Sequence, residues 1–143
     1  MSTRCQVAFY ENANEKDLRK FHTLIYRHSD GYPEEPGVLN DLKEFFKKWI
    51  PTGRIADVEY TSARCLQFLT NLYDEQTRKF DKQLKNKRSN KMIDTGYGIS
   101  NQFHIDIEYL YAIYPDRIDV YEVDCSDKDI IRRVALTEYT YKF

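Results

Sequence analysis

Apolar and polar residues alternate in stretches at both ends of the chain, with the period of a β-strand. Near the start, Cys5, Val7 and Phe9 alternate with their neighbours over residues 4–10. The turn-forming stretch ENANEKD follows, and residues 18–28 (LRKFHTLIYRH) then predict a second strand that pairs with the first as a hairpin. The clearest alternation is FHIDIEYLYAIY at residues 103–114, and two more strands are predicted in RIDVYEVD and RRVALTEYTYKF.

The middle of the chain carries apolar residues at helical spacing. The stripe of the first predicted helix consists of Val38, Leu42, Phe45, Phe46 and Trp49. Pro51 and Gly53 are expected to end this helix, and Asp57 suits the N-cap of a second, long helix. The stripe of that second helix contains Ala63, Leu66, Leu69, Leu72 and Tyr73. The stretch DTGYGIS has two glycines and little periodicity, which predicts a loop.

This order of elements predicts a single α+β domain over residues 1–143, with the succession β-β-α-α-β-β-β. Because the helices must bury their apolar stripes, we expect them on one face of an antiparallel sheet of about five strands. The opposite face would carry His104, Asp106 and Glu108. That face would be either exposed to water or covered by another chain.

Composition and charge narrow the range of partners. The net charge is −1 and the pI is near 6.3, which argues against a DNA-coating protein and makes nucleic acid an unexpected partner. Twelve tyrosines favour half-buried positions at an interface or a ligand surface. Cys5, Cys65 and Cys125 form no CxxC pair, as expected of reduced cytoplasmic thiols. The sequence MSTRCQVAFY lacks a signal-peptide pattern, and no apolar run reaches membrane-spanning length, so we expect a cytoplasmic protein without a membrane partner.

The joint between the second strand and the first helix, YRHSDGYPEEP, is rich in polar side chains. Gly31 and Pro33 account for the turn, but turn formation does not require Arg27, His28 or Tyr32. If the strand continues, His28 and Asp30 project to the same face, where they could bind a metal or transfer protons. The simpler alternative is that Asp30 makes the turn and His28 lies at a strand edge.

A second set of polar residues is His104-x-Asp106-x-Glu108 in the predicted strand 103–114. These three side chains would share a face and could hold a metal if His28 and Asp30 lay nearby. The alternative is an ordinary exposed sheet face, on which Arg4 or Arg27 would neutralise the acids. The run from Arg78 to Lys91 has seven basic residues and one acid, and a solvated face is favoured there over a phosphate contact.

Three phrases carry a resemblance to a known family: YRHSDGYPEEPG, DTGYGIS, and FHIDIEYLYAIY followed by VYEV. Together they resemble a family of small bacteriophage, prophage and bacterial proteins with a YRHxDGYPE core. The matching positions are Arg4, Tyr26, Arg27, His28, Asp30, Gly31, Tyr32, Pro33, Gly98, His104, Asp106 and Tyr109. The resemblance assigns no catalytic role, but it implies action inside an infected host cell, in host takeover or counter-defence.

Three functional hypotheses follow. The leading one is a non-enzymatic phage-type binding protein in the host cytoplasm that captures a nucleotide-like anionic ligand or a host protein. Its candidate ligand-binding residues are Arg4, Arg27, His28, Asp30, Tyr32, Tyr97, His104 and Asp106. The second is a metal-assisted phosphoester hydrolase, which requires the two histidine motifs to converge. The third is a homo-oligomeric interaction protein that associates through the tyrosine-rich sheet. No catalytic residue, metal or cofactor is assigned from the sequence.

Overall fold

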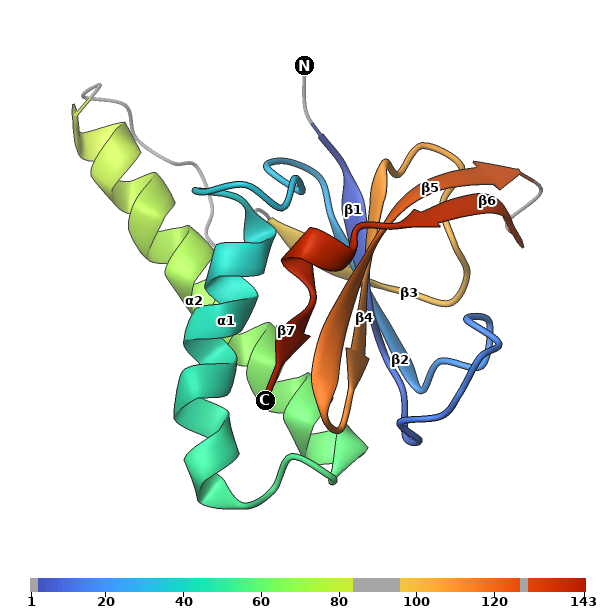
Figure 1. The fold of residues 1–143 in the computed structure, drawn as a ribbon. Helices are drawn as coiled ribbons and strands as arrows, with labels where there is room; N and C mark the ends of the chain where they lie inside the picture. The colour runs from blue at the N-terminus through green and yellow to red at the C-terminus, as the bar shows by residue number, and fades with distance from the viewer. Residues whose placement is uncertain (1–2, 84–95, 127–128) are drawn as a thin grey trace.

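The computed structural model describes residues 3–83, 96–126 and 129–143 of the chain, and it has the predicted α+β order of elements (Figure 1). The two main helices are α1 (Val38–Trp49) and α2 (Val58–Gln83), and the short 3₁₀ helices are η1 (Ile50–Thr52) and η2 (Thr137–Tyr139). The strands are β1 (Cys5–Phe9), β2 (Thr23–Arg27), β3 (Tyr97–Ser100), β4 (Tyr109–Tyr114), β5 (Arg117–Ser126), β6 (Asp129–Ala135) and β7 (Tyr141–Lys142).

The sheet is mixed, whereas the sequence predicted a purely antiparallel one. Its strand order is β3-β2-β1-β4-β5-β6, with β7 also paired to β5. All neighbours are antiparallel except β1 and β4, which run parallel with Cys5 opposite Tyr109. The parallel pair arises because β3 runs in the same direction as β1, and the chain then crosses over β2 and β1 through residues 101–108 before it starts β4.

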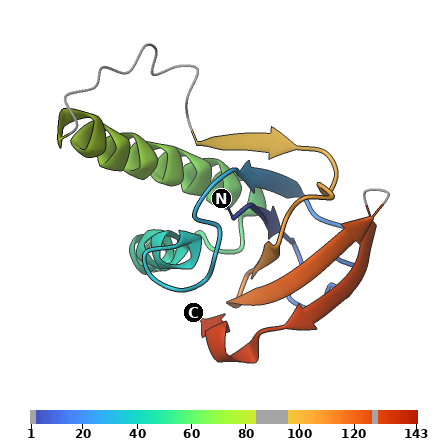
Figure 2. The same cartoon turned by 90° about the horizontal axis from the view of Figure 1, so that it is seen from above.

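Over the central strands, both faces of the sheet are covered by the chain itself. The helices α1 and α2 cover one face (Figures 1 and 2), and there Val7, Ile25 and Tyr111 pack against helix residues such as Leu42. The opposite face is covered by two loops, residues 10–22 and 101–108. The buried residues on that face are Ala8, Tyr10, Leu18, Leu24, Phe103, Ile107, Leu110, Ala112, Tyr114 and Val123. The expectation that this face is either wet or covered by another chain is therefore wrong.

The predicted last strand RRVALTEYTYKF is divided into the end of β6, η2 and β7. Two other predicted strand boundaries are also wrong, and the covering loops explain why. The predicted strand 103–114 begins only at Tyr109, since residues 101–108 form the crossover. Phe103 and Ile107 are buried there while Ile105 is 68% exposed, so their alternation comes from a loop that turns apolar side chains inward. The predicted strand 18–28 is limited to β2, because Leu18 belongs to the other covering loop, where its carbonyl accepts a hydrogen bond from the Tyr10 hydroxyl at 2.7 Å.

A further correction concerns DTGYGIS, which was expected to be a loop. Its second half forms β3, which pairs with β2 and places Tyr97 opposite Arg27. Glycine lowers strand propensity, but the neighbouring strand supplies hydrogen-bond partners that outweigh it. This short strand brings Tyr97 to the site described below.

The helix boundaries follow their predicted signals. Gly37 is the N-cap residue of α1, and Gly53, at φ +77°, ends η1 after Pro51. The carboxylate of Asp57 accepts a hydrogen bond from the backbone N–H of Tyr60 at 3.3 Å, which confirms Asp57 as the cap of α2. The short connection between the helices lets their apolar stripes face the sheet together.

Candidate functional site

The structure divides the eight candidate residues among three places. Arg27 and Tyr97 meet under the helices, in what we term the Arg27 cluster. His28, Asp30 and Tyr32 lie on the turn between β2 and α1. The remaining residues, Arg4, His104 and Asp106, form the His104 cluster on the opposite side of the sheet. The structure thus separates residues that the sequence hypothesis placed in one pocket.

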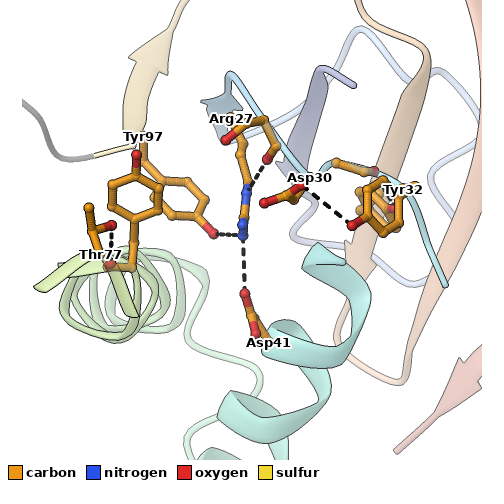
Figure 3. Close-up of polar contacts among 10 residues, drawn as sticks. Arg27, Asp30, Tyr32, Asp41, Thr77 and Tyr97 are labelled. Carbon is orange, nitrogen blue, oxygen red and sulfur yellow. Dashed lines mark hydrogen bonds and ion pairs between the residues drawn. The ribbon is translucent and has the colours of Figure 1, made fainter. Parts of the chain in front are cut away.

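The Arg27 cluster is a buried set of polar contacts between β2, β3 and α1 (Figure 3). Arg27 is 3% exposed, and its Nη1 donates to Asp41 Oδ2 at 3.1 Å and to the hydroxyl oxygen of Tyr97. Its Nε donates to the carbonyl oxygen of Ser29 at 2.5 Å. Because side chains alternate along β2, Arg27 lies on the helix side of the strand together with Ile25. The Arg27 guanidinium therefore donates its hydrogen bonds to groups of the chain itself.

Burial dominates the electrostatics of this cluster. It raises the pKa of the Tyr97 hydroxyl well above the usual tyrosine value, although the Arg27 guanidinium acts in the opposite direction. Burial likewise raises the pKa of the Asp41 carboxyl, against the lowering effect of its hydrogen bond from Arg27. Tyr97 also packs edge-on against Tyr73 of α2, with ring centroids 6.3 Å apart. The cluster thus ties both helices to the edge of the sheet.

Hydrogen bonds hold the backbone of the turn between β2 and α1, whereas most of its side chains are exposed. Asp30 has a positive φ of 54°, and its carbonyl accepts a hydrogen bond from the N–H of Val38 at 3.0 Å. The N–H of Gly31 donates to Thr3, and the carbonyl of Gly31 accepts from the Tyr111 hydroxyl at 2.6 Å. Three fixed backbone contacts therefore set the shape of the turn.

The side chains of the turn point outward from this base. His28 and Asp30 are exposed, and the Tyr32 hydroxyl lies 3.4 Å from the Asp30 carboxylate (Figure 3). Tyr32 is half-buried. Most of the turn is exposed or half-buried, and its buried residues are Gly31, Pro33 and Gly37.

The His104 cluster fastens the crossover loop to the sheet. The His104 ring stacks on Tyr26 with centroids 4.4 Å apart, and its Nδ1 lies 3.9 Å from the Asp106 carboxylate. Arg4 pairs with the same carboxylate at 3.4 Å, which confirms Arg4 as a cationic neighbour of Asp106. Arg27, the other candidate for that role, pairs with Asp41 instead. The cluster is about half exposed, so its ion pairs are screened by water.

Sequence reasoning missed two polar residues that organise these clusters, Gln6 and Asp41. Gln6 is fully buried in β1, where its Nε2 donates to the carbonyl of Gln102 at 3.2 Å and its Oε1 accepts from the N–H of His104 at 3.0 Å. The signal was available in both cases. Gln6 interrupts the apolar run CQVAF, and Asp41 lies three residues after Val38 and four before Phe45, within the apolar stripe of α1.

Replacing Gln6 with leucine should release the crossover loop while leaving the sheet folded. The change removes both hydrogen bonds and leaves the Gln102 carbonyl and the His104 N–H without their partner, at a cost of about 1–3 kcal/mol. Amide hydrogen exchange should become faster at His104 and stay unchanged at Val7. Gln67→Leu, at an exposed position of α2, serves as the control. Unchanged exchange at His104 in Gln6→Leu would show that Gln6 does not hold the loop.

The described residues contain no group of three or more His, Cys, Asp or Glu side chains that could hold a metal ion. His28 and Asp30 lie on the turn, whereas His104 and Asp106 lie on the crossover loop beside Tyr26. Cys5 and Cys65 are fully buried, and burial raises the pKa of the Cys5 thiol to about 12. An inert thiol of this kind is a packing residue.

An acidic face surrounds the end of β4 next to the turn, and we define it by Glu34, Glu108, Tyr109, Glu122 and Tyr139. The Tyr139 hydroxyl donates to Glu34 Oε1 at 3.1 Å. Tyr109 lies opposite Glu122 across β4 and β5. Burial raises the pKa of Tyr109, and the carboxylates of Glu34, Glu122 and Glu108 add to the rise. Carboxylates from three parts of the chain therefore converge here.

The overall charge distribution agrees with this concentration of acids. The run 78–91 holds seven basic residues and one acid, so the other residues hold 15 basic and 22 acidic side chains, a net charge of −7. The charge of −1 for the whole chain conceals this separation. The residues outside this run are therefore net negative.

Among the described residues, no helix is long and apolar enough to cross a membrane. Comparisons of the chain with protein-family models, curated proteins and solved structures find no match. Function must therefore be inferred from the geometry and charge described above.

Proposed function

We propose that this chain is a non-enzymatic, phage-type binding protein that acts in the host cytoplasm by engaging a host protein through the turn between β2 and α1. The observation that carries this proposal is that the polar groups of the Arg27 cluster bind one another, whereas the adjacent turn is exposed and its backbone is hydrogen-bonded at Asp30 and Gly31. A preorganised, exposed element loses little conformational freedom on binding, which favours recognition of a protein surface.

The same geometry gives less support to a nucleotide-like anionic ligand. Arg27 and Arg4, which were to bind the anion, are paired with Asp41 and Asp106. Exposed carboxylates, including Asp30 and Glu34, surround the start of α1. Hollows on the described surface at the C-terminal end of β1, at β5–β6 and between the helices are lined by other residues. A protein partner agrees better with these features.

The alternatives rest on weaker observations. A metal-assisted hydrolase needs His28, Asp30, His104 and Asp106 to converge, and they lie in two separate places. A homo-oligomer built on the tyrosine-rich sheet cannot use the central part of the face opposite the helices, because the chain's own loops cover it.

The test compares a turn variant with a matched control. His28→Ala/Tyr32→Ala removes the exposed side chains of the turn, and His22→Ala/Tyr60→Ala removes the same residue types elsewhere on the surface. Each protein is immobilised and exposed to host-cell extract, and any captured protein is purified so that its affinity can be measured by calorimetry. We expect the turn variant to weaken this affinity by roughly a hundredfold, as loss of contacts at the centre of an interface does.

Two results would contradict the proposal. One is an equal affinity of the captured protein for the turn variant and for the control. The other is a nucleotide or metal that co-purifies with the wild-type chain in native mass spectrometry and is lost from the turn variant.

A further inference from the structure

The sheet surface beside the turn is not covered by the described elements. Because side chains alternate along β5, Glu122 lies on the same face as Ile118 and Val120, which lie under the helices. Val134 lies opposite Glu122 across β5 and β6 and is 63% exposed. Figures 1 and 2 show β5 and β6 extending away from α1 and α2. The helix-side face is thus buried at its centre and open where β5 and β6 extend.

This open sheet face and the acidic face are continuous. Tyr109 lies next to Glu122 and is partly buried against the central core. The hydrogen bond from Tyr139 to Glu34 joins the C-terminal segment to the turn. Across β4, β5 and β6 the order on this face is Tyr109, Glu122 and Val134, so apolar side chains flank an exposed carboxylate. A surface of this kind offers apolar contact area and negative charge side by side.

The negative charge of this surface favours a basic partner. Desolvation raises the pKa of the Tyr139 hydroxyl, and its hydrogen bond to Glu34 and the charges of Glu34 and Glu138 add to the rise. A nucleic acid or an acidic peptide would be repelled by these carboxylates, whereas lysine and arginine would be attracted. The long apolar stems of lysine and arginine also pack well on tyrosine rings.

We propose that the partner of this chain contributes a lysine- or arginine-rich segment that lies across the acidic face and the open end of β5 and β6; this inference rests on the proposed function. The turn residues Tyr32 and Asp30 form one side of the contact, and Val134 forms the other. The carboxylates steer association, and contacts of the apolar side-chain stems with Tyr109 and Val134 retain the bound segment.

The experiment uses the full chain and a short labelled peptide of alternating lysine and alanine, with a glutamate–alanine peptide of equal length as the negative probe. Glu34→Lys/Glu122→Lys reverses the charge of the acidic face. Glu11→Lys/Glu75→Lys makes the same change in net charge at exposed positions elsewhere. Binding is followed by fluorescence anisotropy and by amide chemical shifts.

We expect the basic peptide to bind the wild type and the control alike, and to bind the charge-reversed variant roughly tenfold more weakly at low salt. The shifts should concentrate at Tyr109, Glu122 and Tyr139, and the glutamate peptide should not bind. Equal weakening by both variants, or shifts spread over the whole surface, would show a general charge effect and overturn the inference.

The captured host protein separates this inference from the proposed function. If that protein binds Glu34→Lys/Glu122→Lys as well as wild type but loses affinity for His28→Ala/Tyr32→Ala, the proposed function stands and the acidic face is excluded. If the peptide binds the acidic face while the turn variant binds the captured host protein as well as wild type does, the turn fails as the contact and the surface inference survives.

Discussion

Replacing Asp41 with alanine is expected to lower the free energy of unfolding by about 3–5 kcal/mol, because it leaves the Arg27 guanidinium buried without its anion. A typical domain has a total stability of about 5–15 kcal/mol, so this loss approaches the limit of folding. Urea denaturation followed by circular dichroism measures the change.

A matched change on the same helix separates the buried pair from helix effects. Glu44 pairs with Lys47 at 3.9 Å on the exposed face of α1, so Glu44→Ala should cost less than about 1 kcal/mol. Arg27→Met/Asp41→Leu replaces both charges with apolar groups and should recover most of the stability lost in Asp41→Ala. Equal losses for Asp41→Ala and Glu44→Ala would show that the Arg27 cluster does not stabilise the fold.

The Gly37→Ala substitution is expected to have the second large effect. An added Cβ would lie 1.9 Å from the carbonyl oxygen of Tyr32 and 2.7 Å from that of Glu34, so the turn must move. Overpacking of this kind costs about 1–3 kcal/mol, and more when the opposing atoms belong to the backbone. We expect a loss at or above the top of that range, together with altered amide shifts from Asp30 to Glu35.

Gly98→Ala is the control, because an added Cβ there meets no atom within 4 Å. This variant should unfold at nearly the wild-type denaturant concentration. A Gly37→Ala protein with wild-type stability and unchanged turn shifts would mean that the turn is more adaptable than its contacts indicate. The turn could then no longer be treated as a preorganised binding element.

The layout of helices and strands could be predicted from periodicity, but the neighbours of each strand could not. A period of two fixes which side chains share a face, but not which face meets the helices: Arg27 was a candidate neighbour of Asp106 and Glu108, yet it lies on the helix side with Ile25. Periodicity does not specify which strand lies next to β1. The parallel pairing with β4 depends on the crossover through residues 101–108, whose alternating pattern is that of a strand.

The candidate site was predicted in part for the same reason. Arg4 was correctly named as a neighbour of Asp106, because exposed acids on a sheet need a nearby cation. The partner of Arg27 was not foreseen, since Asp41 belongs to a helix and Tyr97 to a strand read as a loop. The acidic face could not be predicted at all, because Glu34, Glu122 and Tyr139 meet only in the folded chain.

The parallel pairing of β1 with β4 affects folding during synthesis. β1 can pair with β4 only after the ribosome has made the chain through Tyr109 and beyond. Closing so long a loop slows folding, and sheets dominated by distant contacts fold on roughly millisecond-to-second timescales. All five residues of β1 are buried in the finished protein, so an apolar strand edge stays open during synthesis. Chaperones that shield such edges would therefore set how much of the protein reaches its native state.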